Sequence, residues 1–181
     1  GFPDEDLGRG ELGNSFAVLV SSAPTALWGI YHIFSSNKVL TDVRKEVLDL
    51  DRDEPDATNV LDLADIKNVC PILLSVFQET LRHRSLATSP KKILQDVILD
   101  GPYLLKKGSM LLLPAPVQRT DTNNWGEDAL EFDHLRFVNK NKKWNRTAFR
   151  SFGCGHVLCP GRHFASTEIM ALAAIITGDS F

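Results

Sequence analysis

The chain has 181 residues, of which 43% are hydrophobic and 24% charged, and its formal net charge is -3. This length suffices for one ordinary hydrophobic core, and the small negative charge gives no reason to expect nucleic-acid binding. The three cysteines, Cys70, Cys154 and Cys159, are too few for a disulfide framework and fit a reducing compartment.

The first long apolar segment runs from Phe16 to Phe34 and contains no charged residue. It is just long enough to raise the question of a membrane span, but serines and Pro24 interrupt it. We therefore expect a helix buried in a large domain, capped by Asn14 or Ser15 and ending near residue 35. Pro24 lacks a backbone donor and should kink or locally open this helix. The polar start of the chain predicts no signal peptide.

Apolar residues at helical spacing predict two further helices. One spans about Asn37 to Leu48, and the acidic segment after it, residues 49–56, is typical of a solvated surface turn. The other begins at Pro71, a residue favoured in the first helical turn, and runs to about Arg84. Within it Glu79 and Arg82 lie three residues apart, so their side chains share a face and are able to pair. If that pair is exposed, it contributes little to stability.

A β-rich region follows the third helix. Short strands are predicted at Ile93–Leu99, Tyr103–Lys106 and Ser109–Leu113. The dipeptides Asp100-Gly101 and Lys107-Gly108 are typical of turns, so we expect each to connect two neighbouring strands. A basic, loop-like segment comes later in the chain and contains Lys140, Lys142, Lys143, Arg146 and Arg150. Such a run is most simply a solvated face.

The stretch from Phe152 to Ala165 combines glycines, Cys159 and Pro160 directly before an apolar segment at helical spacing. The glycines permit tight turns, and Pro160 suits the start of a helix. Cys159 therefore lies where a loop enters a helix N-terminus, and the helix dipole and free N–H groups there favour a thiolate. A thiolate at this place suits a nucleophile, a zinc ligand or an axial ligand of haem iron. The plain alternative is a buried structural cysteine.

This stretch resembles the haem-binding signature of the cytochrome P-450 superfamily, F-x-x-G-x-x-x-C-x-G. Phe152, Gly155, Cys159 and Gly161 fill its fixed positions, and Gly153 lies in the same loop. The resemblance implies that Cys159 is the axial thiolate of a b-type haem, with Phe152 packed beside the sulfur. Such a thiolate favours cleavage of the O–O bond.

Two further motifs of the superfamily are similar to segments of this chain. Glu79-Thr80-Leu81-Arg82 matches E-x-x-R, and Phe132 to Phe137 resembles F-x-P-x-R-F with His134 in place of the proline. The resemblance implies a buried triad of Glu79, Arg82 and Arg136. A buried carboxylate between two guanidiniums is fully bonded, whereas loss of one partner leaves a buried charge unpaired.

The segment Ser21 to Thr25 is similar to the distal-helix motif of the superfamily, in which the threonine lies beside bound oxygen and helps to deliver protons. Thr25 keeps that threonine, but Pro24 stands where the motif has an acid. A proline at this point recurs in the branch with sterol 7α-hydroxylases, prostacyclin-synthase-like proteins and fungal relatives. The plain alternative for Thr25 is a hydroxyl bonded to a carbonyl one turn earlier.

The resemblance implies weaker assignments for several other residues. The substrate pocket would be lined in part by Ala23, Leu86, Ala87 and Thr88. The haem propionates would meet Lys91, for which a solvated lysine is an equal alternative. They would also meet His156, although the motif usually has its basic residue one position later, where Val157 stands.

By this resemblance the fold is mainly α with a small β-sheet, a partial cytochrome P-450 fold from the distal helix through the Cys-bearing helix. The whole chain, residues 1–181, is expected to be the C-terminal part of a single domain, without the N-terminal half, its membrane anchor and the last strands. We expect exposed apolar surface on such a fragment. The intact protein would lie on the cytoplasmic face of the endoplasmic reticulum membrane.

The implied function is that of a haem-thiolate monooxygenase. It would insert one oxygen atom of O₂ into a hydrophobic substrate, in this branch a sterol or other lipid. NADPH would supply electrons through a flavoprotein reductase, which the basic segment near the Cys loop would face. Thr25 favours this reaction.

Other interpretations stay open on the residues alone. The missing acid keeps open a reductase-independent isomerase that rearranges peroxides. A truncated, non-catalytic fragment would keep the motifs without binding haem. The spacing Cys154-x-His156-x-x-Cys159-x-x-x-His163 resembles a zinc knuckle. A nucleophilic Cys159 with His156 or His163 as its base is a further alternative.

Overall fold

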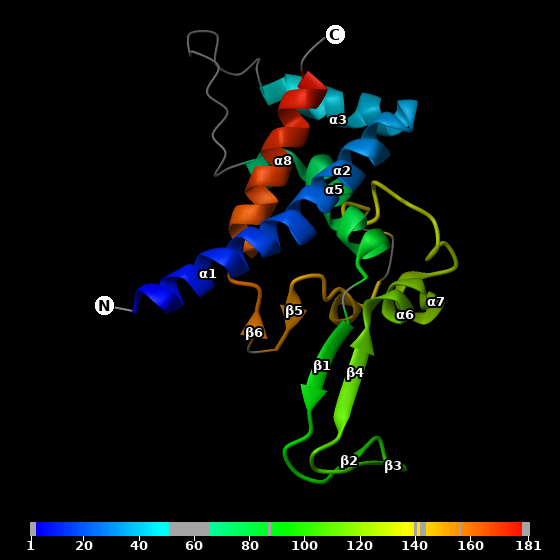
Figure 1. Ribbon diagram of the computed structural model, residues 1–181. Helices are drawn as coiled ribbons and strands as arrows, with labels where there is room; N and C mark the ends of the chain where they lie inside the picture. The colour runs from blue at the N-terminus through cyan, green and yellow to red at the C-terminus, as the bar shows by residue number, and fades with distance from the viewer. Residues whose placement is uncertain are drawn as a thin grey trace. The chain divides into compact units, whose positions relative to one another are not determined.

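The computed structural model describes residues 3–50, 66–86, 88–139, 141, 144–155 and 157–178. It is mainly helical with short antiparallel strand pairs (Figure 1), which confirms the predicted fold class. The chain folds into two compact units. Unit 1 consists of Gly1–Arg84, Phe132–Lys142 and Cys159–Phe181, and unit 2 consists of Ser85–Glu131 and Lys143–Leu158. Each is described by itself below.

The N-terminal helix of unit 1 is longer than predicted. It comprises α1 (Asp4–Ala17), a π-helical turn η1 (Val18–Ser22) and α2 (Ala23–Phe34). The prediction that Asn14 or Ser15 caps it was wrong, because three acidic residues occupy its first turn and complement the helix dipole there. Arg9 adds ion pairs to Glu5 and Asp6 on the same exposed face.

Pro24 opens this helix locally, as predicted. The π-helical turn η1 ends directly before it, and the N–H of Ala23 bonds the carbonyl of Val18, five residues earlier. A proline inside a helix removes one i→i−4 hydrogen bond, and a wider π turn is a common way to accommodate such a break. The hydroxyl of Thr25 donates to the carbonyl of Ser21 at 2.7 Å, so it bonds a backbone acceptor in the opened turn.

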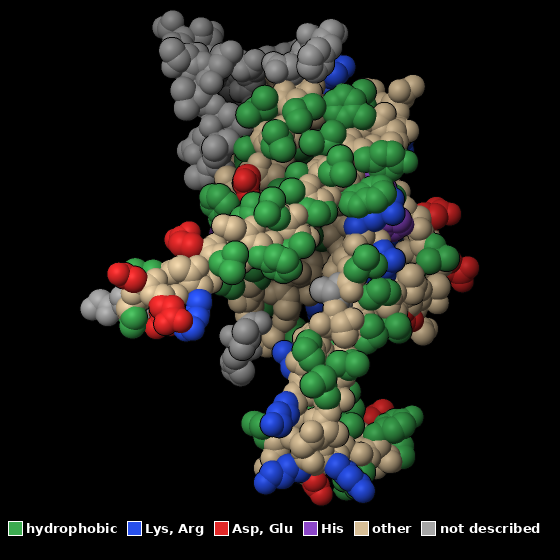
Figure 2. Space-filling model, in the orientation of Figure 1, with side chains coloured by type: hydrophobic (Ala, Val, Ile, Leu, Met, Phe, Trp, Pro, Cys, Tyr) green, Lys and Arg blue, Asp and Glu red, His purple; other side chains and the backbone are tan. Residues whose placement is uncertain are grey.

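The continuous helix Asp4–Phe34 is long and apolar enough to cross a membrane, by length and composition. Large apolar side chains lie exposed along it, including Leu12, Phe16 and Leu19. Figure 2 shows hydrophobic side chains over this helix. The expectation of exposed apolar surface is therefore confirmed. Core helices of soluble proteins have the same length and composition, so the expectation that this segment does not span a membrane stays a prediction.

The core of unit 1 is built from α2, α3 (Asn37–Leu50), α5 (Pro71–Arg84) and α8 (Arg162–Gly178), with the short α4 (Ile66–Val69) against α5 and α8. The two helices predicted at Asn37–Leu48 and Pro71–Arg84 are confirmed, the first with two more residues. Ile33, Val43, Leu73, Val76 and Met170 are buried between them. The acidic loop predicted at residues 49–56 lies mostly outside the described residues.

Polar side chains of α3 bind the ends of two neighbouring helices. Both carboxylate oxygens of Glu46 accept backbone N–H groups at the start of α5, from Ile72 and Leu73, at 2.8 Å each. Arg44 donates from Nε to the carbonyl of Thr177, near the end of α8, at 3.0 Å. Burial raises the pKa of Glu46, and the two backbone hydrogen bonds oppose that shift. These bonds satisfy backbone groups that helix ends leave without intrahelical partners.

Unit 2 pairs its strands differently from the prediction. The strand β1 (Thr88–Lys92) pairs with β4 (Met110–Pro114), and the short hairpin of β2 (Val97–Leu99) and β3 (Tyr103–Leu105) is inserted between them. Asp100-Gly101 does turn this hairpin, with φ of 48° and 82°. The predicted strand Ile93–Leu99 was wrong over its first half, and β1 was missed because Pro90 and two lysines argue against a strand.

Two short helices follow β4, α6 (Ala115–Thr120) and α7 (Thr122–Trp125). Asp121 caps α7 by accepting the N–H of Asn123 at 3.0 Å. The buried Trp125 stacks on Trp144 with 5.5 Å between ring centroids. Its Nε1 donates to the carbonyl of Gln118 at 2.9 Å, so the polar atom of this ring is satisfied. A 3-10 turn (Arg146–Ala148) precedes the Cys loop.

An aromatic cluster in unit 1 joins α2 to the end of α5. His32 stacks on Phe132, with 3.8 Å between centroids and 7° between planes. Arg84 lies over the ring of Trp28 at 3.6 Å and donates from Nε to Nε2 of His32 at 3.3 Å. Burial lowers the pKa of His32 to about 4, and the charges of Arg84 and His83 act in the same direction. His32 is therefore neutral in the folded protein at neutral pH.

The lowered pKa of His32 predicts a pH dependence of stability. Between pH 6.5 and about 4 the unfolded chain binds a proton at His32 that the folded chain does not bind. The free energy of unfolding should therefore fall as the pH falls through this window. Denaturant unfolding at several pH values measures the free energy of unfolding as a function of pH. This pH dependence should be weaker for His32→Phe, which cannot take a proton. The control is Trp28→Phe, which alters the same cluster but removes no titratable group, so it should keep the pH dependence of the wild type. An equal pH dependence in the wild type and in His32→Phe would show that His32 does not cause it.

Candidate functional site

A buried carboxylate lies at the centre of the polar network of unit 1. Glu79 is 0% exposed, and the two guanidiniums beside it, Arg82 and Arg136, are 3% and 1% exposed. Helical spacing on α5 places Glu79 and Arg82 on one face. Arg136 comes from the irregular segment after Phe132. The exposed-pair interpretation of Glu79 and Arg82 is therefore wrong.

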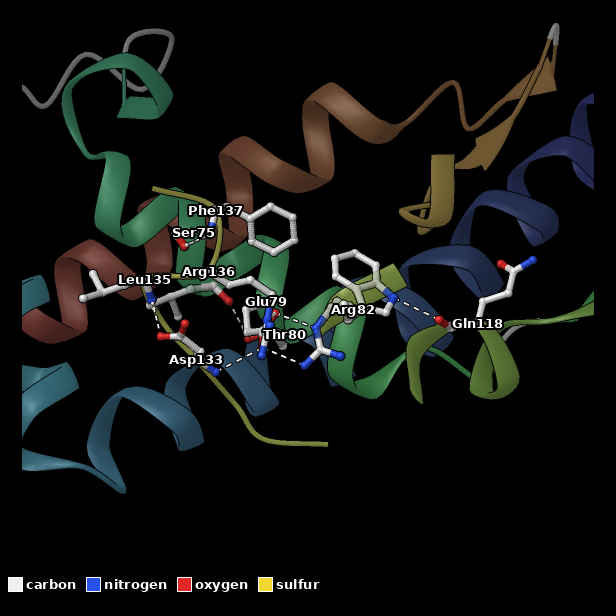
Figure 3. A network of polar contacts seen from close by, with 11 residues as sticks. Ser75, Glu79, Thr80, Arg82, Gln118, Asp133, Leu135, Arg136 and Phe137 are labelled. Atoms are coloured by element: carbon white, nitrogen blue, oxygen red, sulfur yellow. Dashed lines mark hydrogen bonds and ion pairs between the residues drawn. The ribbon is translucent and has the colours of Figure 1, made fainter. Parts of the chain in front are cut away.

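Both oxygens of Glu79 are occupied (Figure 3). Arg82 binds them through two nitrogens, Nε to Oε2 at 2.6 Å and Nη2 to Oε1 at 2.7 Å. Arg136 approaches with Nε at 3.0 Å from Oε1 and 3.2 Å from Oε2. This is the fork-on-carboxylate geometry that makes Arg–Glu pairs strong. The structure thus brings together the three side chains that the motifs predicted as a triad.

The backbone of the loop that carries Arg136 is bound to the same helix. The N–H of Asp133 donates to Oε1 of Glu79 at 3.0 Å, and the N–H of Phe137 donates to the hydroxyl of Ser75 at 3.1 Å. Ser75 and Glu79 lie one turn apart on α5. The loop segment 133–137 is therefore fastened along one face of α5 by polar contacts, and its fold depends on Glu79.

The Cys loop begins with a two-residue hairpin in unit 2. The strands β5 (Gly153–Cys154) and β6 (Val157–Leu158) pair antiparallel. Gly153 and Gly155 have φ of 90° and 71°, which explains glycine at both positions. His156 lies outside the described residues, so its predicted contact with a propionate stays a prediction. Phe152, directly before the hairpin, is half-buried.

Cys159, the first residue of the last segment of unit 1, carries a free and exposed thiol. Its carbonyl accepts both the N–H of Arg162 at 3.3 Å and Nη1 of the same residue at 3.1 Å. The cysteine backbone is thereby fastened to the first turn of α8. A Cβ built on Gly161 would lie 3.9 Å from the sulfur, an ordinary van der Waals distance. An exposed thiol is accessible to a bound metal or cofactor.

Thr25 lies on α2 beside a small, almost wholly apolar cavity between α2, α5 and α8. Thr25, Gly29, Val76 and Met170 are among the lining residues. Because the hydroxyl of Thr25 donates to the carbonyl of Ser21, its oxygen keeps lone pairs that accept a hydrogen bond. The plain interpretation of Thr25 is therefore what the structure shows, and it leaves an acceptor role open.

The structure does not test the residues predicted to line the substrate pocket or to meet the haem propionates. Ala23 is exposed on α2, and Leu86 is 72% exposed. Thr88 and Lys91 are both exposed on β1. Ala87 lies outside the described residues, as do Lys140, Lys142 and Lys143 of the basic segment. The pocket-lining and propionate roles of these residues stay predictions.

Two observations on the described part of the chain concern metal ligands and the reactivity of Cys70. No group of three or more His, Cys, Asp or Glu side chains there is arranged to hold a metal ion. His156, one ligand of the zinc-knuckle spacing, is not among those residues. Burial raises the pKa of the Cys70 thiol to about 12, and the charge of Glu46 acts in the same direction. Cys70 is therefore a protonated core residue rather than a reactive one.

The sequence analysis did not predict two side-chain contacts of α3. His134 donates from Nε2 to Oδ2 of Asp42 on α3 at 2.8 Å, and Glu46 caps α5 from the same helix. The only sign of the first contact in the sequence was that His134 stands where the family motif has a proline. Nothing in the sequence pointed to Asp42, which lies 92 residues earlier.

Comparisons with known proteins agree with the motifs. The family described as Cytochrome P450 matches residues 3–177. Cytochrome P450 monooxygenase nodJ of Hypoxylon pulicicidum is 34% identical over 97% of this chain and 37% of the relative. A cytochrome P450 monooxygenase of Gibberella zeae is 32% identical over 98% and 36%. Cytochrome P450 7A1 of Oryctolagus cuniculus is 26% identical over 85% and 34%. The chain thus spans little more than a third of the length of these curated relatives.

The buried position of Glu79 predicts a large effect of Glu79→Gln on stability. The amide cannot compensate two buried guanidiniums, so the free energy of unfolding should fall by about 3–5 kcal/mol. Glu5→Gln is the matched control, because it removes the charge from an exposed pair with Arg9 and should change stability little. Denaturant titration measures both variants. Similar small losses for the two would show that the buried network contributes no more than the surface pair.

Proposed function

Because the chain belongs to the cytochrome P450 family, we propose that it is the C-terminal, haem-binding part of a haem-thiolate monooxygenase with Cys159 as the axial ligand. The observation that carries this proposal is the free, exposed thiol of Cys159, three residues before α8, whose backbone carbonyl binds Arg162 in the first turn of that helix. The family signature F-x-x-G-x-x-x-C-x-G surrounds that thiol. The intact enzyme extends beyond this chain.

The residues of the family signature would hold the cofactor. Cys159 would bind the iron of haem b, and Phe152, Gly153, Gly155 and Gly161 would form the loop against its proximal side. Positive φ at Gly153 and Gly155 and the small size of Gly161 support this role. Lys91 and His156 would pair with the propionates. When bound, the haem supplies activation of O₂ and insertion of one oxygen atom into a C–H bond.

The Glu79 network has a positioning role in this proposal. Its members bind one another and leave Glu79 no free oxygen for a substrate. They fasten the loop segment 133–137 to α5, and α5 packs against α8, which begins three residues after Cys159. Glu79, Arg82 and Arg136 would thereby keep rigid the two helices on which the position of the haem ligand depends.

Thr25 would orient protons on the distal side. Its hydroxyl donates to Ser21, so its oxygen would accept a hydrogen bond from a water molecule there. Pro24 replaces the acid of the family motif, so protons would have to come through water rather than from a neighbouring carboxylate. Ala23, Leu86, Ala87 and Thr88 would line part of the substrate pocket.

The intact enzyme would act on a hydrophobic small molecule, a sterol or other lipid. The similarity to Cytochrome P450 7A1 supports this branch of the family. Electrons from NADPH would arrive through a flavoprotein reductase that faces the basic segment. Loss of reductase affinity with rising salt concentration would support that contact. The place of action would be the cytoplasmic face of the endoplasmic reticulum membrane.

A reductase-independent isomerase is the second candidate, and Pro24 in the position of the missing acid favours it. An isomerase would rearrange a peroxide without consuming NADPH. A hydroxylated product formed in proportion to NADPH consumed would support the monooxygenase, and turnover of a peroxide without NADPH would support the isomerase.

The assignment of Cys159 is tested on the intact enzyme with two matched variants. Reduced wild-type protein exposed to carbon monoxide should show the far-red-shifted Soret band of thiolate ligation. Cys159→Ser should lose this band because the thiolate is gone. Cys154→Ser removes the other thiol of the loop and should keep it. A band that survives Cys159→Ser, or that disappears with Cys154→Ser, would overturn the assignment.

A further inference from the structure

The segment 133–136 is a tight turn that places Arg136 against Glu79. The N–H of Arg136 donates to the carbonyl of Asp133 at 3.0 Å, so the four residues form a β-turn with His134 in its second position. The carboxylate of Asp133 accepts the N–H of Leu135 at 3.0 Å. Aspartate is favoured in the first position of such turns, and proline in the second because its φ is already fixed. His134 thus occupies a position that a proline would suit.

His134 binds a second helix from this position. Its Nε2 lies 2.8 Å from Oδ2 of Asp42 on α3, and the two side chains are 8% and 34% exposed. The bond spans 92 residues of sequence. The turn is therefore held on α5 through Glu79 and on α3 through Asp42, and Phe137 directly after it binds Ser75 of α5. Proline offers no side-chain hydrogen bond of this kind.

The partner of His134 lies on the side of α3 that also binds α5. Asp42 and Glu46 are four residues apart and share one helical face. Glu46 caps α5 through the N–H groups of Ile72 and Leu73. One face of α3 therefore fixes both the start of α5 and the turn that delivers Arg136 to the same helix.

A residue other than proline leaves the backbone of the unfolded turn more freedom, which folding must remove. We propose that Asp42 and His134 form a positioning pair. Their hydrogen bond offsets this cost of ordering the turn and keeps Arg136 on Glu79, so that haem retention depends on the pair. This inference rests on the proposed haem-binding function. Neither residue would touch the cofactor, because both would act through the turn and Arg136.

The test uses the intact, haem-loaded enzyme and follows the rate of haem transfer to an excess of a haem-free acceptor protein. Asp42→Ala and His134→Ala should each accelerate haem loss by about tenfold, as expected for a hydrogen bond to a charged group. The double variant should lose haem no faster than either single variant, because both remove one interaction. Lys45→Ala, an exposed change on the same helix, should leave the rate unchanged.

The distinctive prediction is rescue by proline. In the Asp42→Ala background, His134→Pro should return haem loss to near the wild-type rate, because proline restricts the turn without needing a partner. His134→Ala in the same background should not rescue. The thiolate Soret band should follow the same order. If Asp42→Ala alone fails to fold, recovery of folded protein by the added proline gives the same answer, and absence of recovery overturns the proposal.

Two results would overturn the pair: additive losses in the double variant, or no rescue by proline. The same cycle measured as unfolding of the haem-free protein should be non-additive as well, and this readout does not depend on haem. A wild-type protein without the thiolate band would instead refute the proposed function. A non-additive unfolding cycle in that protein would still support the pair as a restraint on the turn.

Discussion

One buried negative charge, that of Glu79, organises the polar network of unit 1. Glu79 has no exposed surface, and a carboxylate in that position is stable only when opposite charges and hydrogen-bond donors occupy both oxygens. Arg82 comes from the same helix, but Arg136 and the N–H of Asp133 come from a loop with no regular secondary structure of its own. The charge therefore organises the loop, and the loop in turn compensates the charge.

Helix α5 is fixed along its whole length by different interactions. Glu46 caps its start, Glu79 and Ser75 bind the loop at its middle, and Arg84 enters the aromatic cluster at its end. Phe132 connects the bonded loop with the aromatic cluster, since it stacks on His32 and directly precedes that loop. Such fixing of α5 gives α8 a rigid surface against which to pack.

The sequence predicted those features that local patterns encode. The bounds of α5 follow from Pro71 and helical periodicity, and the motif E-x-x-R predicted which side chains meet. Strand β1 was missed because Pro90 argues against a strand, although proline is tolerated at a sheet edge. The bond from His134 to Asp42 could not be predicted, because it depends on how α3 and the loop pack. Tertiary contacts of this kind leave no periodic signal in one chain.

We infer that the Glu79 network makes haem binding by the intact enzyme possible. The measurement that decides this is the haem content per polypeptide of the intact enzyme carrying Glu79→Ala, purified beside the wild type. The variant should incorporate no haem, because two buried guanidiniums lose the carboxylate that they share and release the loop from α5. Normal haem content in the variant would show that haem binding does not need the network and would leave Glu79 a residue of stability alone.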